Sequence, residues 1–131
     1  ELICDVVAAE PCEILFLNLT KLLTTCTSGC SFHQRLIHNL LRISAMKSLN
    51  LSSRMMHTAP KSIRDKLLSY LSEQAMVNSN THFTIPFDRQ QLADYLGVDR
   101  SALSNELSKM QKDGLISFKK NEFTLTSENA L

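Results

Sequence analysis

The chain has 131 residues, a length that fits one ordinary domain or two small ones. Its 14 Lys and Arg residues nearly balance 13 Asp and Glu residues, so the net charge of +1 indicates no strong general attraction to nucleic acid. Hydrophobic residues make up 44% and charged residues 21%, as in soluble globular chains.

No apolar run approaches the roughly 20 residues of a membrane span. We expect a cytoplasmic protein with no membrane contact. Because the chain begins at Glu1 inside a strand-like run, without an initiator Met or signal peptide, we also expect a fragment.

The first 30 residues favour strands followed by a short helix. Residues 2–9 and 13–17 are predicted as two strands, with Pro11 at the break between them. A short helix is predicted over residues 19–25, and residues 27–29 are predicted as a loop.

A long helix is predicted from Ser31 to His57, because this stretch contains no Gly or Pro. Apolar residues recur along it at steps of about three and four, which favours packing against a twin helix. Packing on its own domain is the alternative. The residues predicted to form a dimer seam are Leu36, Leu40, Ile43, Met46, Leu49 and Met56.

The next stretch predicts a break, a helix and a strand. Residues 58–60 interrupt the helix, and Pro60 is expected in the first turn of the following one. The apolar spacing from Ile63 to Ala75 predicts that helix, and residues 78–80 predict a loop. Phe83 and Ile85 alternate as in a short strand that ends at Pro86.

Two short helices separated by a tight turn are predicted next. Asp88 has the properties of an N-cap, with Gln91 three residues on to complete a capping box. Leu92, Ala93 and Leu96 form the apolar face of the first helix. Gly97 predicts the end of that helix, because glycine adopts a positive φ without a Cβ clash.

The second helix is predicted to start after an Asp99 cap and to separate two faces. Leu103, Leu107 and Met110 share the inward face at steps of four and three. Outward polar residues near the start of a helix are suited to contact with base edges in a DNA groove. These candidate base-reading residues are Arg100, Ser101, Ser104 and Asn105.

A hairpin is predicted after Asp113 and Gly114, from strands at 115–118 and 122–125. Residues 119–121 form its turn, and Asn121 is expected to take any positive φ that the turn requires. Basic and polar groups at the hairpin tip and at the start of the first helix are suited to phosphate. The candidate phosphate contacts are Arg89, Gln90, Lys119 and Lys120.

The stretch FTIPFDRQQLADYLGVDRSALSNELSKMQKDGLISF resembles the DNA-binding domain of the cyclic-AMP receptor protein and fumarate–nitrate reduction regulator (Crp/Fnr) superfamily, especially a branch common in anaerobic Gram-positive bacteria. The resemblance covers about the last 70 residues. VVAAEPCEILFL is similar to the last strands of the family's effector-binding β-roll. The family's recognition helix usually carries Arg where this chain has Asn105, so the resemblance implies an altered DNA site.

The resemblance implies a mainly α fold with a small β component. Residues 1–28 would be the remnant of the β-roll, 29–57 a dimerisation helix and 58–131 a winged helix-turn-helix domain. The implied partners are double-stranded DNA, a second copy of the chain, RNA polymerase and, in the full-length protein, a small-molecule effector. Relatives sense different signals, so the effector stays open, as does the choice between activator and repressor.

No nucleophile elbow, P-loop or dinucleotide motif is present, so we expect no enzyme and no cofactor in this chain. His33, His38, His57 and His82 are scattered, and we expect them in solvent or at an interface. The cysteines are expected to be incidental thiols, although the spacing of Cys26 and Cys30 leaves a metal or redox role as an alternative. The four cysteines are Cys4, Cys12, Cys26 and Cys30.

Two functions of different classes are compatible with the sequence. The first is a transcription regulator gated by an effector. The second is a helical dimerisation or interaction module that uses a winged helix for protein contacts. Exposed aromatic or leucine residues on the second helix would favour the second function. The polar residues 100, 101, 104 and 105 favour the first.

Overall fold

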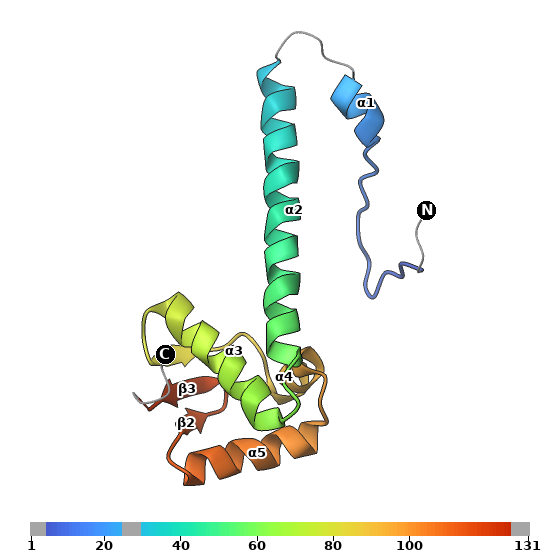
Figure 1. The fold of residues 1–131 in the computed structure, drawn as a ribbon. Helices are drawn as coiled ribbons and strands as arrows, with labels where there is room; N and C mark the ends of the chain where they lie inside the picture. Colours follow the sequence, from blue (N-terminus) through green and yellow to red (C-terminus); the bar gives the residue numbers. More distant parts are fainter. Residues whose placement is uncertain (1–4, 25–29, 127–131) are drawn as a thin grey trace. The chain divides into compact units, whose positions relative to one another are not determined.

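The computed structural model of the chain describes residues 5–24 and 30–126. It divides into two units, residues 1–45 and 46–131, which are described separately below. Mainly helical structure with a small sheet agrees with the predicted fold class (Figure 1). In chain order the elements are α1 (Leu19–Thr24), α2 (Ser31–Thr58), α3 (Ile63–Asn78), β1 (His82–Thr84), α4 (Arg89–Leu96), α5 (Arg100–Lys112), β2 (Ile116–Lys119) and β3 (Glu122–Leu125).

The two strands predicted near the start of the chain are wrong for the residues that the structure describes. Residues 5–17 adopt no strand, and Val7 and Phe16 are 84% and 88% exposed. A strand needs a neighbouring strand to satisfy its backbone N–H and C=O groups, and none of residues 5–17 pairs with one. The short helix α1 is confirmed. Residues 2–4, Thr25 and the predicted loop at 27–29 lie outside the described residues.

The long helix is confirmed as α2, which runs without interruption from Ser31 to Thr58. Most of its apolar side chains face solvent. In the predicted seam, Leu36 and Leu40 are half-buried and the other four residues are more than half exposed. Leu41 and Leu51 are also exposed, at 66% and 63%, so α2 presents apolar residues on more than one face.

The start of α3 differs from the prediction for Pro60. The helix begins at Ile63, after Ser62 as N-cap, and the Ser62 hydroxyl accepts a hydrogen bond from Asp65 N at 3.0 Å. Pro60 therefore lies in the connection and not in a first helical turn. A side-chain acceptor that satisfies a free helical N–H fixes this boundary more strongly than the fixed φ of proline.

The three strands form one antiparallel sheet in the order β1-β3-β2. Phe123 in the central strand is fully buried and pairs in register with Phe83 on one side and Phe118 on the other. Ile85 lies beyond the end of β1, but its N–H donates to Asn121 O at 2.9 Å. β2 and β3 are the predicted hairpin, and β1 joins it as a third strand.

The β2–β3 hairpin is called the wing below. The positive φ in its turn belongs to Lys120 (φ 56°), so the prediction for Asn121 is wrong. The Asn121 side chain instead contacts the segment after β1, where its Nδ2 donates to Ile85 O at 3.2 Å. Together with the backbone bond from Ile85, this contact holds the hairpin against the chain that enters α4.

The core of the second unit lies where α3, α4 and α5 meet the sheet, whose strands lie beside α3 and α5 (Figure 1). All three helices and the central strand contribute side chains with no exposed area, which makes one continuous core. These side chains include Leu67, Leu71, Leu92, Leu96, Leu103, Leu107, Met110 and Phe123.

Candidate nucleic-acid interface

The helix–turn–helix is built from α4, the three residues 97–99, and α5, as predicted. Asp88 and Gln91 form the predicted capping box, with the Asp88 carboxylate accepting from Gln91 N at 2.8 Å. Gly97 takes φ 63°, and a Cβ there would meet nothing within 4 Å, so the backbone conformation and not space favours glycine. Ala93 is completely buried, which suits a close approach of the two helices.

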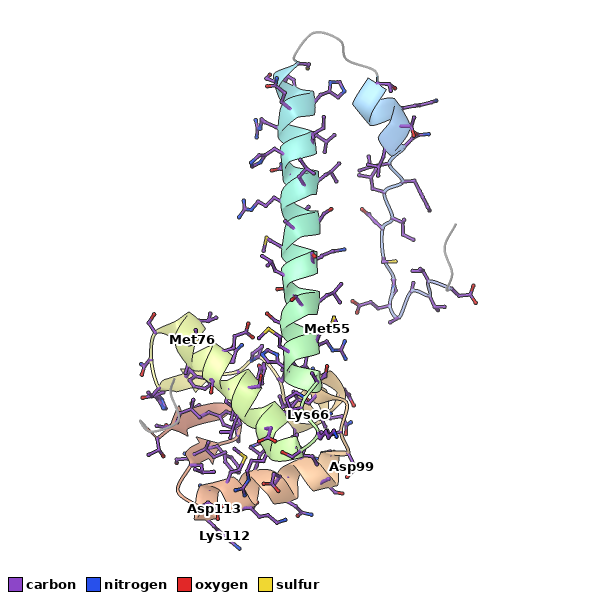
Figure 2. The ribbon with its side chains drawn as sticks, in the orientation of Figure 1. Met55, Lys66, Met76, Asp99, Lys112 and Asp113 are labelled. Carbon is purple, nitrogen blue, oxygen red and sulfur yellow. The ribbon has the colours of Figure 1, made fainter. Side chains whose placement is uncertain are left out.

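Asp99 fixes the first turn of α5. Its carboxylate accepts hydrogen bonds from Ser101 N at 2.8 Å, from Ala102 N at 2.9 Å, and from the Ser101 hydroxyl. The Ser101 hydroxyl and the Ala102 N–H hold the pKa of Asp99 below its ordinary value. Figure 2 shows Asp99 at the start of α5, with Lys112 and Asp113 at the far end. The cap sets the direction in which the exposed first turn points.

The four candidate base-reading residues surround one hollow in the surface at the start of α5. This hollow measures about 490 Å³ and is lined by Asp99 together with Arg100, Ser101, Ser104 and Asn105. The opposite face of the helix carries Leu103, Leu107 and Met110, which have no exposed area. The structure therefore brings the four polar residues together on a face that the core does not use.

The candidate phosphate residues have different surroundings. Lys119 and Lys120 are exposed at the turn of the wing. Gln90 is exposed and donates to the Asp94 carboxylate at 2.9 Å. Arg89 instead lies against the wing, where its Nη2 donates to Lys120 O at 3.0 Å and its guanidinium carbon is 4.7 Å from the ring centroid of Phe118.

Burial lowers the pKa of Arg89 from its ordinary value, in agreement with its position against the Phe118 ring. The bond to Lys120 O uses one N–H of a guanidinium that carries five. Arg89 therefore links the start of α4 to the tip of the wing. This structural role was not predicted from the sequence.

A second contact that the sequence did not reveal joins α3 to α5. Arg64 donates to Glu106 from Nε and to Asp113 from Nη2, both at 2.7 Å. These two hydrogen bonds raise the pKa of Arg64, and the bond to Glu106 has the larger effect. The available signal was Glu106, a charged residue directly before the buried Leu107, but a partner 42 residues earlier in the chain cannot be identified from spacing.

A third unpredicted contact involves His57, and the expectation of solvent or an interface is wrong for this residue. His57 is only 3% exposed. Its Nε2 lies 2.9 Å from the Glu73 carboxylate, and its Nδ1 lies 3.0 Å from the hydroxyl of Tyr95. Ser53 donates to the other Glu73 oxygen at 2.8 Å. The last turns of α2 are thus joined to α3 and α4 by polar contacts.

No three His, Cys, Asp or Glu side chains gather where they could hold a metal ion in residues 5–24 and 30–126. Cys12 is exposed and Cys30 is half-buried, both as free thiols, whereas Cys4 and Cys26 lie outside the described residues. None of the helices in the described part of the chain combines the length and hydrophobicity that a membrane span requires.

The comparisons with known proteins agree with this geometry. Residues 65–131, more than half of the chain, match the family of Crp-like helix-turn-helix domains. The match contains α4, α5 and the wing, and this family is typically found in non-enzymatic regulators. A comparison with curated proteins finds no match. The predicted Crp/Fnr resemblance is confirmed, and the chain belongs to the Crp-like helix-turn-helix family of DNA-binding domains.

Proposed function

We propose that the chain is the C-terminal part of a transcription regulator that binds an inverted-repeat DNA site as a homodimer. In this proposal, residues 1–28 are the end of an effector-binding β-roll, 29–57 the dimerisation helix and 58–131 the DNA-binding domain. A small-molecule or redox signal acts on the N-terminal domain, and the bound regulator contacts RNA polymerase. The observation that carries the proposal is the polar hollow at the start of α5, opposite a fully buried apolar face.

Base recognition is assigned to the first two turns of α5. A guanidinium can donate two hydrogen bonds to guanine O6 and N7, and a carboxamide can pair with adenine N6 and N7. Arg100 and Asn105 supply these groups at the rim of the same hollow. Ser101 and Ser104 are small enough to let the helix approach the groove floor. The Ser101 hydroxyl is held by Asp99, so it offers bases its oxygen lone pairs rather than its proton.

Phosphate binding is assigned to the tip of the wing and to the start of α4, which Arg89 joins. Lys119 and Lys120 at the wing tip, and Gln90 near the start of α4, are exposed side chains that can reach a DNA backbone. Arg89 contributes positive charge and orients the wing through its bond to Lys120 O. Residues 88–125 contain six basic and six acidic residues, so DNA binding depends on where the basic residues lie and not on net charge.

Dimerisation through α2 is supported by its exposed apolar residues. Ile43, Met46, Leu49 and Met56 are 52–68% exposed, which leaves a stripe that pairing with a second copy would bury. Two copies of α5 related by a two-fold axis would read half-sites about one helical turn apart.

A protein-interaction module is the second function considered. Contact faces between proteins are enriched in aromatic residues, Met and Arg and depleted in Ser and Asp. The hollow at the start of α5 is lined by an aspartate, two serines, an asparagine and an arginine, but by no aromatic residue. The polar character of this face favours DNA over protein as its partner.

Selection of binding sites from randomised duplex DNA tests the assignment. The wild-type chain should select an inverted repeat, whereas Asn105→Arg should select guanine at one further position in each half-site. Each base contact is worth about 1–3 kcal/mol of discrimination. Lys61→Gln, at an exposed position outside the hollow, is the matched control and should select the wild-type site. Identical motifs for wild type and Asn105→Arg would show that Asn105 does not contact a base, and no selected motif at all would refute sequence-specific binding.

A further inference from the structure

The second unit contains a larger cavity, of about 710 Å³, away from the recognition face. Its walls come from the last turns of α2, from α3, and from the segment between Pro86 and Tyr95. Cavities of this size, mostly apolar with a few polar groups, are typical of small-molecule sites. No step of the proposed DNA binding uses it.

Three aromatic rings line this cavity and lie close to one another. Tyr70, Phe87 and Tyr95 have ring centroids 5.0–6.0 Å apart. Tyr70 is almost fully buried, while Phe87 and Tyr95 are half-buried and present part of their rings. A planar apolar molecule can stack on such a group of rings.

The charged groups around the rings favour an anion. Lys47 and Arg54 line the cavity from α2, and the guanidinium carbon of Arg54 lies 5.4 Å from the ring centroid of Tyr95. Glu73 is the one acidic residue in the lining, and both of its oxygens already accept bonds from His57 and Ser53. Among the described residues, none forms an ion pair with Lys47.

The cavity is open to solvent on the side of two apolar residues. Leu51 and Val77 line it and are 63% and 74% exposed. A molecule that enters here would cover apolar surface now in contact with water, which adds to its binding. The opening also allows substitution of Val77 with little effect on the core.

We propose that this cavity binds a small planar aromatic anion, an aromatic carboxylate or sulfonate, with its ring against Phe87 and Tyr95 and its charge at Lys47. Because the walls belong to α2, α3 and α4, the bound molecule would contact the same three helices that His57 joins through Glu73 and Tyr95. The proposal goes beyond DNA recognition and does not depend on it, since binding is measured without DNA.

Calorimetric titration of the full chain with 2-naphthoate, compared with the uncharged 2-naphthalenemethanol, tests the charge and ring requirements. The anion should bind more tightly than the alcohol. Lys47→Gln should weaken binding of the anion by roughly three- to fivefold, as expected for a partly exposed ion pair, and should leave the alcohol unchanged. Lys61→Gln is the matched control, because Lys61 is exposed and lies outside the cavity.

A second variant tests the location of the site. Val77→Glu should weaken anion binding by more than Lys47→Gln does, because it places a carboxylate at the opening, and far-UV circular dichroism should show an unchanged helical signal. The proposal is overturned if 2-naphthoate does not bind or binds no better than the alcohol. The proposal is also overturned if Lys47→Gln and Val77→Glu both bind 2-naphthoate as tightly as wild type does. The probe would then bind at another place, for example on the exposed apolar residues of α2.

Discussion

The helix α2 and the helix-turn-helix domain use their apolar residues in opposite ways. In the domain, leucines such as Leu67, Leu92 and Leu107 have no exposed area. Along Ser31–Thr58, all of which the structure describes, His57 is the one buried residue, while Leu49 is 67% exposed. The domain therefore has a core of its own, whereas most apolar side chains of α2 are exposed. This difference places the core that stabilises the fold in the domain, and it is the reason why we propose α2 as the dimer contact.

The two regions also differ in how their polar groups are used. α4 and α5 each begin with an aspartate cap, and Arg64 ties α3 to α5. In α2, side chains of the last turns contact other elements through polar atoms, at Ser53, Arg54 and His57. These contacts join the last turns of α2 to α3 and α4.

The largest expected effect is in the domain core. Leu107→Ala removes a fully buried side chain of α5 and should lower the free energy of unfolding by about 2–5 kcal/mol. Leu41→Ala, at a position 66% exposed, should change it by about 0.5 kcal/mol or less. Urea denaturation followed by circular dichroism measures both. Similar losses for the two variants would remove the contrast between core and helix.

The next effect concerns pairing through α2. Leu49→Glu would place a carboxylate in the proposed seam and should weaken the dimer strongly, because the ionised group would lose its hydration there. Leu51→Glu is its matched control, because Leu51 is equally apolar and similarly exposed but lies on another face of the helix. Analytical ultracentrifugation at micromolar concentration should show a dimer for wild type and Leu51→Glu. If Leu51→Glu alone dissociates the dimer, the seam lies on the other face.

A smaller effect is expected at the start of α5. Asp99→Ala removes the acceptor for two backbone N–H groups and should lower the melting temperature by about 4–8 °C. Asp99→Asn keeps a cap and should lose less. The pKa of Asp99 is held below its ordinary 3.8 in the folded state, so the ionised cap stabilises the protein above that pH. Its contribution is lost as pH falls through the lowered pKa.

Thermal denaturation between pH 7 and pH 2.5 checks the sign of this effect. The difference in melting temperature between wild type and Asp99→Asn should shrink at the acid end, because both side chains are then uncharged. A difference that grows on acidification would contradict the assigned direction of the pKa shift.

The smallest effect is expected at the wing. Lys119→Ala should weaken binding to all DNA sequences equally, because phosphate contacts carry no sequence information. The slope of log K against log salt concentration should decrease by about 0.9 for each lysine removed. Lys112→Ala, near the other end of α5, is the control and should leave the slope unchanged. A change in the preferred sequence would show instead that the wing reads bases.

Local features of this protein were determined by the sequence alone. The Asp88 and Asp99 caps, the Gly97 turn and the buried leucine stripes were all predicted correctly. Each depends on residues two to four positions apart, because helix caps and the 3.6-residue period are set by near neighbours. The four polar residues at the start of α5 gather on one surface for the same reason.

Contacts between distant parts of the chain were decided only by the tertiary structure. Arg64 reaches Glu106 and Asp113 across 42 and 49 residues, and His57 reaches Tyr95 across 38. Lys120, and not Asn121, has the positive φ in the wing turn, because the Asn121 side chain donates to the carbonyl of Ile85, a residue 36 positions earlier. The strand predictions were wrong for residues 5–17 for a related reason. A strand forms only where a neighbouring strand pairs with its backbone. The residue pattern of one segment does not show whether such a neighbouring strand is present.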